Sequence, residues 1–239
     1  MRSVAVNVGA NTNEPGFRAP IRKYGDFEYV PIPESEPTSE SVPTYGDLDL
    51  RMEIPESVRE TPVHFDPEWP ELDHGEAYTY GDPFGVKATP LLELSAGDFV
   101  FFYATLDAED DRPGWQAPDW GAYLIGHFRL AQDPLSGEAY QALSDAAKEP
   151  FSNNAHVKRE AFDARVMLLG DPWGSKLYRE AVPLSSRERG VDANRIVTDL
   201  SSDSGKGPWW RRVLRFGSVE TEELLEIIDT REYDRCFEE

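Results

Sequence analysis

Short apolar runs and alternating stretches along the chain predict β-strands. Residues 4–8 are mostly apolar and contain three valines, and residues 27–33 alternate apolar with polar positions until prolines end the pattern. Residues 94–106 and 120–131 are the clearest pair, because aromatic and branched side chains dominate both. The stretch between them, residues 107–119, is acidic, so we expect a hairpin with a long polar loop.

Helical spacing occurs in two other segments. Residues 136–148 carry apolar side chains three or four positions apart behind Ser136, a candidate N-cap, and residues 219–229 repeat this spacing. Residues 164–169 predict one more strand, and residues 175–181 predict a helical turn or two.

The segment of residues 31–90 is rich in proline and acidic side chains and has few periodic runs. We expect it to be a long ordered excursion over the surface. Strands and helices are mixed without a regular βαβ alternation, which favours the α+β class. The predicted fold is a curved or barrel-like mixed sheet with peripheral helices, and residues 1–239 are expected to form a single domain.

Charge is the most unusual global property. Asp and Glu total 45 against 24 Lys and Arg, for a net charge of −21, and only six of the basic residues are lysine. Dense carboxylates with few lysines predict a halophilic protein from a salt-rich cytoplasm, where salt screens their repulsion. In that setting an acidic surface does not argue against nucleic-acid binding, and only local basic clusters are informative.

Several classes of protein are excluded by what the sequence lacks. Its one cysteine, Cys236, allows no intrachain disulfide and no cysteine-based metal cluster. No window approaches the ~18 apolar residues of a membrane span, so the expected location is the cytoplasm. The easily recognised hydrolase, zinc-protease and nucleotide-binding motifs do not occur. We assign no metal ligands from the sequence and leave the cofactor open.

His64 and Asp66 are the first candidates for chemistry. They lie two residues apart, so in an extended segment their side chains share a face. A histidine beside a carboxylate can act as a general base or belong to a metal site. The alternative is a hydrogen-bonded turn ahead of Pro67.

A rare basic cluster lies around His156, with Lys158 and Arg159 close by. These cations could contact phosphate, while Asn154 or His156 touches a base. The alternative is a helix N-terminus at which Asn154 is the cap and the charges are solvated.

Two further stretches are candidates for ligand or nucleic-acid contacts. The loop Asn11, Thr12 and Asn13 follows a strand and a glycine, and could be either a ligand cradle or an ordinary turn. Residues 206–216 form the strongest basic-aromatic stretch, in which rings could stack on bases and arginines hold phosphate. Its candidate residues are Lys206, Trp209, Arg211, Arg212 and Arg215. The alternative for part of it is an amphipathic strand that buries its apolar face.

Two stretches around the central strand pair resemble a known architecture. Residues 97–103 and 123–128 look like the central hairpin of PUA-like domains. These are small β-barrels, and several of them bind nucleic acid or a flipped base. The resemblance implies a barrel in which Tyr103 could stack on a base, although core packing is the alternative for this side chain.

A second resemblance covers more of the chain, from the first strand to about Leu184. It is carried by residues 6–21, 26–34, 62–69, 78–83, 97–98 and 154–159. In that order these stretches are similar to the nucleotide modification-associated domain 3 family. The resemblance implies a setting, the modification of bases in DNA, and does not imply a particular reaction.

Three functions remain open. The leading hypothesis is recognition of a modified base or nucleotide in DNA, with arginines on phosphate and a pocket lined by Asn11, Tyr29, Tyr103 and His156. The second is an enzyme that modifies or removes such a base, with His64, Asp66 and His156 as catalytic acid–base or metal groups. The third is a structural or interaction protein whose acidic surface reflects salt adaptation.

Overall fold

The computed structural model describes residues 1–109 and 112–237, which fall into two compact units. Each unit is assembled from separate stretches of the chain. The first contains Met1–Val30, Phe99–His127 and Tyr178–Glu239, and the second contains Pro31–Asp98 and Phe128–Leu177.

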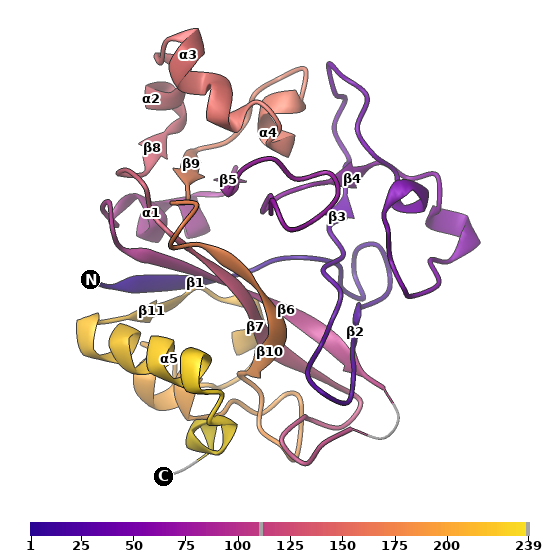
Figure 1. The fold of residues 1–239 in the computed structure, drawn as a ribbon, viewed down its shortest axis with the longest axis vertical. Coiled ribbons are helices and arrows are strands. Elements are labelled where there is room, and N and C mark those ends of the chain that lie inside the picture. Colours follow the sequence, from indigo (N-terminus) through magenta and orange to yellow (C-terminus); the bar gives the residue numbers. More distant parts are fainter. Residues whose placement is uncertain (110–111, 238–239) are drawn as a thin grey trace. The chain divides into compact units, whose positions relative to one another are not determined.

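The first unit is built on a six-stranded sheet (Figure 1). The strand order is β10-β7-β6-β1-β11, and β2 also pairs with β6. The strands are β1 (Ser3–Asn7), β2 (Pro20–Ile21), β6 (Phe99–Ala108), β7 (Trp120–Arg129), β10 (Lys176–Pro183) and β11 (Leu214–Phe216).

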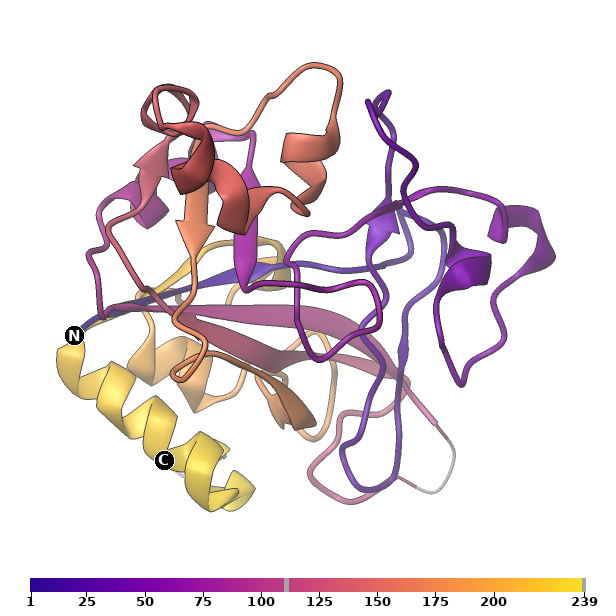
Figure 2. The same ribbon diagram turned by 45° about the horizontal axis from the view of Figure 1, so that its top comes forward.

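The apolar runs of β6 and β7 explain why these strands lie inside the sheet. Eight of the ten residues of each strand are buried, as expected for strands covered on both faces. β1 lies parallel to β6, with Ser3 opposite Phe99. Helix α5 (Ser218–Thr230) packs along the sheet (Figure 2). Its Leu224 belongs to the same buried cluster as Phe101. Burial of this apolar helix stripe holds the C-terminal helix in place.

The second unit consists of small sheets and short helices. β3 and β4 form an antiparallel pair, and a three-stranded sheet has the order β5-β9-β8. Its strands are β3 (Ile32–Pro33), β4 (Val63–His64), β5 (Thr79–Asp82), β8 (Leu135–Ser136) and β9 (Val166–Leu169). Its α-helices are α1 (Gly85–Leu92), α2 (Gly137–Gln141), α3 (Asp145–Lys148) and α4 (Ala155–Lys158). The proline-rich segment therefore supplies β3, β4 and β5 of this unit.

Both units also contain short helical turns that are not α-helical. The 3-10 turns are Tyr45–Asp47, Glu56–Val58, Glu149–Phe151, Trp209–Arg211 and Tyr233–Cys236, and Ile196–Leu200 is a π-helical turn. No helix among the described residues is long and apolar enough to cross a membrane.

The predicted α+β class is confirmed, but the barrel is not. In the part of the chain that the structure describes, the large sheet ends at β10 and β11, and no closed barrel forms. The PUA-like architecture therefore stays a prediction. Residues 110 and 111 of the expected acidic loop lie outside the described residues.

Three local predictions met different outcomes. The helical turn expected at residues 175–181 is wrong, because Lys176–Pro183 forms strand β10 and pairs with β7. The segment of residues 136–148 forms two helices, α2 and α3, instead of the single helix expected. Ser144 separates them, because it is the N-cap of α3 and its backbone is extended. The helix expected at residues 219–229 is confirmed as α5.

Candidate active site

Three buried side chains converge in the second unit: His64, Asp66 and His156. One nitrogen or oxygen atom from each lies within 4.8 Å of the other two. His156 Nε2 is 3.8 Å from Asp66 Oδ2, and the two imidazole rings meet edge to face at 4.7 Å. The structure thus brings together the three residues that the sequence proposed for catalysis. We call this group the His–Asp–His centre.

Pairing of β3 with β4 places a carboxylate behind His64. Ile32 lies opposite His64 in this ladder, and Glu34 follows β3 directly. His64 donates from Nδ1 to Glu34 Oε2 at 2.6 Å, and both side chains are buried. Since an ionised carboxylate only accepts hydrogen bonds, the ring proton is on Nδ1 and Nε2 keeps its lone pair in neutral His64.

A second carboxylate holds His156 in the same way. His156 donates from Nδ1 to Asp163 Oδ1 at 2.7 Å, which leaves Nε2 facing toward Asp66. The ring lies against the backbone of β5 at Gly81, where a Cβ atom would be only 2.6 Å from His156 Cδ2. This close approach requires glycine at that position.

Arg159 joins the two outer carboxylates. The backbone on either side of it pairs with the segment after β3, through bonds from Ser39 N to Lys158 O and from Glu160 N to Pro37 O. This pairing brings Arg159 Nη2 to 2.7 Å from Glu34 Oε1 and Nη1 to 2.6 Å from Asp163 Oδ2.

Asn154 connects Asp66 with the helix that carries His156. Its side-chain oxygen accepts from His156 N and caps α4, while Nδ2 donates to Asp66 Oδ1 at 2.7 Å. Gly81 N donates to the same Asp66 oxygen at 2.8 Å. The orientation of Asp66 is therefore fixed by two donors on one oxygen.

The three carboxyl groups of this network have different acidities. Burial raises the pKa of Asp66 to about 7, against the lowering effect of His156 and of the two donors on its Oδ1. Burial alone would also raise the pKa of Glu34, but hydrogen bonds from His64 and Arg159 outweigh it and hold that pKa at about 2. The pKa of Asp163 is lowered too, because bonds from His156 and Arg159 outweigh its burial.

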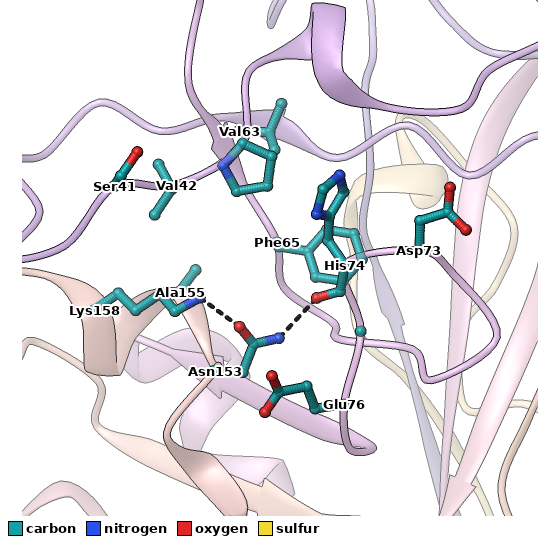
Figure 3. A pocket seen from close by; sticks show the side chains of 12 residues that line it. Ser41, Val42, Val63, Phe65, Asp73, His74, Glu76, Asn153, Ala155 and Lys158 are labelled. Atoms are coloured by element: carbon teal, nitrogen blue, oxygen red, sulfur yellow. Dashed lines mark hydrogen bonds between the residues drawn. The ribbon is translucent and has the colours of Figure 1, made fainter.

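A pocket of about 290 Å³ lies beside β4 and α4 (Figure 3). Val63 of β4 and Phe65 of the turn after it line this pocket, whereas His64 and Asp66 do not. Inside the pocket, Asn153 donates to the carbonyl of His74 at 2.8 Å and accepts from Lys158 Nζ. Its remaining lining residues are Ser41, Val42, Pro43, Asp73, Gly75, Glu76 and Ala155.

Comparison with known families places this geometry in a biological setting. The model of the nucleotide modification associated domain 3 family matches residues 2–226. The chain belongs to this family. The resemblance seen in the sequence is thus confirmed, and membership links the chain to modification of nucleotides or DNA. No curated protein and no solved structure shows significant similarity to it.

In this nucleotide modification associated domain, the other predicted ligand residues of the first unit make local contacts. Asn11 Oδ1 accepts from Asn13 N at 2.8 Å, which closes a turn on which Thr12 is exposed. Tyr29 is buried, and Tyr103 is fully buried with its hydroxyl donating to the carbonyl of Arg212. Tyr103 therefore packs in the core and its ring presents no open face to a base, which corrects its predicted stacking role.

The residues of the basic-aromatic stretch, 206–216, differ in their burial and partners. Trp209 is fully buried and donates from Nε1 to Val191 O, so the predicted stacking of this indole on a base is wrong for this conformation. Arg212 pairs with Asp203 at 2.8 Å. The side chains of Lys206, Arg211 and Arg215 are exposed.

Sequence reasoning missed the two outer carboxylates. Arg159, a predicted phosphate contact, pairs with both of them in the structure. Asp163 had a detectable signal, because it lies four residues after Arg159. Glu34 had none, because only the pairing of β3 with β4 brings it to His64 across 30 residues.

Proposed function

We propose that this domain is an enzyme that acts on a nucleotide or on a base in DNA, with the His–Asp–His centre as its catalytic group. One observation carries the proposal: His64, Asp66 and His156 meet in a buried site, and a carboxylate orients each imidazole. Membership of a family associated with nucleotide modification supplies the substrate class.

The chemistry of the three groups suits proton transfer. Each neutral imidazole presents Nε2 as the atom that can take up a proton, since Nδ1 is held by Glu34 or Asp163. A carboxyl group whose pKa is raised to about 7, as that of Asp66 is, can both give and accept a proton near neutral pH. Perturbed carboxyl groups of this kind are concentrated at catalytic sites.

The competing hypotheses have less support. Recognition of a modified base by stacking needs open aromatic faces, and Tyr103 and Trp209 are fully buried. The ion-pair network gives little support to a purely structural role, because buried ion pairs stabilise a fold less than apolar packing of the same volume. A buried network of this size therefore supports a role in chemistry.

The proposal is tested by following the fate of nucleosides. The full-length protein is incubated with free nucleotides and with DNA carrying plain and modified bases, in the presence of divalent metals. The products are digested to nucleosides and analysed by mass spectrometry. We expect one nucleoside to change mass or disappear, and this conversion to be slowed roughly 1,000-fold by Asp66→Asn.

Asp145→Asn is the matched control, because Asp145 is an exposed carboxylate at the start of α3. We expect it to convert the substrate at the wild-type rate. Unchanged nucleosides in every reaction, or equal rates for Asp66→Asn and wild type, would exclude this centre as the catalytic group. Binding of a modified base without conversion would instead favour recognition.

A further inference from the structure

We infer that the His–Asp–His centre is a binding site for one divalent transition-metal ion, held by Nε2 of His64, Oδ2 of Asp66 and Nε2 of His156. The inference deepens the proposed function and rests on it for the role of the site. Metal binding is nevertheless measured without a substrate, so the two can fail separately.

The donor set is the first argument. Two imidazole nitrogens and one carboxylate oxygen are a typical ligand set for zinc or for non-haem iron in catalytic sites. Such sites keep coordination positions open for water or substrate. The three donors come from β4, from the turn after it and from α4, and all lie within the second unit.

The outer partners of the histidines are the second argument. A metal-ligating histidine donates its other ring N–H to a carboxylate, a carbonyl or a water, which fixes the tautomer and makes the ligating nitrogen more basic. Here both histidines do so, with Glu34 at 2.6 Å and Asp163 at 2.7 Å. Two such carboxylates on two converging imidazoles are not needed to pack a core.

Charge balance is the third argument. The network contains the carboxyl groups of Glu34, Asp66 and Asp163 and one guanidinium, that of Arg159. The network therefore holds three carboxyl groups against one guanidinium, and a dication bound at its centre would offset this excess of acidic groups.

The geometry requires only a small contraction. Two atoms that each lie about 2.1 Å from one ion are at most about 4.2 Å apart. One donor atom from each of the three residues lies within 4.8 Å of the other two, and His156 Nε2 is already 3.8 Å from Asp66 Oδ2. Metal binding is therefore expected to draw the imidazoles and the carboxylate together by side-chain movement alone.

The experiment uses the full chain, stripped of metal with a chelator and then titrated with Zn²⁺ and with Co²⁺. Calorimetry and elemental analysis of the dialysed protein give affinity and stoichiometry. We expect one equivalent of metal in the wild type. Loss of outer partners of this kind costs 10–100-fold in affinity, so removing a direct ligand in His156→Gln should weaken binding more than about 100-fold.

His74→Gln is the matched control, because His74 is an exposed histidine that is not one of the three ligands. Its affinity should equal that of the wild type. If His156→Gln does not fold, zinc-edge X-ray absorption of the wild type still counts the imidazole ligands, and two are expected. A wild type that retains no stoichiometric metal, fewer than two imidazole ligands, or equal binding by His156→Gln would overturn the inference. One bound metal with no conversion of any nucleoside would refute the proposed function alone.

Discussion

Buried histidines occur in both units, but their surroundings differ. In the first unit, His127 lies among the rings of Phe99, Phe101 and Tyr178, and its Nδ1 is 2.7 Å from the Tyr178 hydroxyl. In the second unit, the Nδ1 atoms of His64 and His156 are bonded to carboxylates. Burial of a histidine is therefore a poor guide to function, whereas the chemical nature of its partners is informative.

The difference separates stability from chemistry. His127 packs against the rings of Phe99, Phe101 and Tyr178, which makes it part of the core beside the large sheet. The centre contains an acidic and basic network that contributes less to stability than an apolar core of equal volume. Changes at His127 should therefore lower stability, whereas changes at the His–Asp–His centre should mainly lower activity.

The largest effect is expected from removing both histidines of the centre. His64→Gln and His156→Gln should each slow nucleoside conversion roughly 1,000-fold, and the double variant should lose hardly more than either single one. Residues that act as one unit show such non-additive losses. Rates measured for the three variants decide this, and losses that multiply would show that the histidines act independently.

The second prediction concerns the metal-free protein and its dependence on pH. The folded pKa of Asp66, about 7, lies above its ordinary value of 3.8, so its contribution to stability is complete below pH 3.8 and is lost as the pH rises through 7. Asp66→Asn carries no such charge, and its oxygen can still accept from Gly81 N and Asn154 Nδ2.

In chelator-treated samples, Asp66→Asn should therefore gain on the wild type by a few kcal/mol in free energy of unfolding between about pH 4 and pH 8. Denaturant titrations at several pH values measure this difference. An Asn variant that is less stable than the wild type at pH 8 would mean that the carboxylate serves the fold.

The third prediction concerns the core of the first unit. His127→Ala leaves a cavity beside Phe99 and Phe101, and should lower the free energy of unfolding by about 3 kcal/mol. Metal content should not change, because this residue is not among the three candidate ligands. Loss of metal from a variant that is still folded would contradict the division between the two regions.

The fourth prediction concerns the outer carboxylate of His64. Glu34→Gln keeps the shape of the side chain but removes its charge, and should weaken metal binding by about 10–100-fold. Calorimetric titration with Zn²⁺ measures the affinity. An unchanged affinity would mean that Glu34 only closes the ion pair with Arg159.

The smallest effect is expected at the turn of residues 11–13, which follows β1. Asn11→Ala removes the acceptor of the bond from Asn13 N and should cost about 0.5 kcal/mol of stability, since the residue is partly exposed. Nucleoside conversion should stay at the wild-type rate. A large loss of conversion with normal stability would restore this loop as a ligand contact.

The sequence was informative where local pattern decides structure. Strands β1, β6 and β7 and helix α5 follow from continuous apolar runs and helical spacing. His64 and Asp66 do lie close together, but a hydrogen bond from Asp66 N to His64 O closes the turn that was the alternative to an extended segment. The strand β10 was missed, because its short segment has no two-residue alternation and only pairing with β7 makes it a strand.

Long-range pairing decided what the sequence could not show. His156 lies 90 residues after Asp66, and nothing in either segment shows that β5, β9 and α4 bring them together. The aromatic residues were misjudged for the same reason. A tyrosine or tryptophan suits both a core and a stacking surface, and only the packed structure shows that Tyr103 and Trp209 are fully buried.

The most direct test of the His–Asp–His centre is X-ray diffraction from crystals of the wild-type protein grown with Zn²⁺, recorded on both sides of the zinc absorption edge. The account predicts one strong anomalous peak about 2.1 Å from Nε2 of His64, Nε2 of His156 and a carboxylate oxygen of Asp66. The absence of a peak there, with the three side chains unmoved and zinc bound elsewhere on the protein, would contradict it.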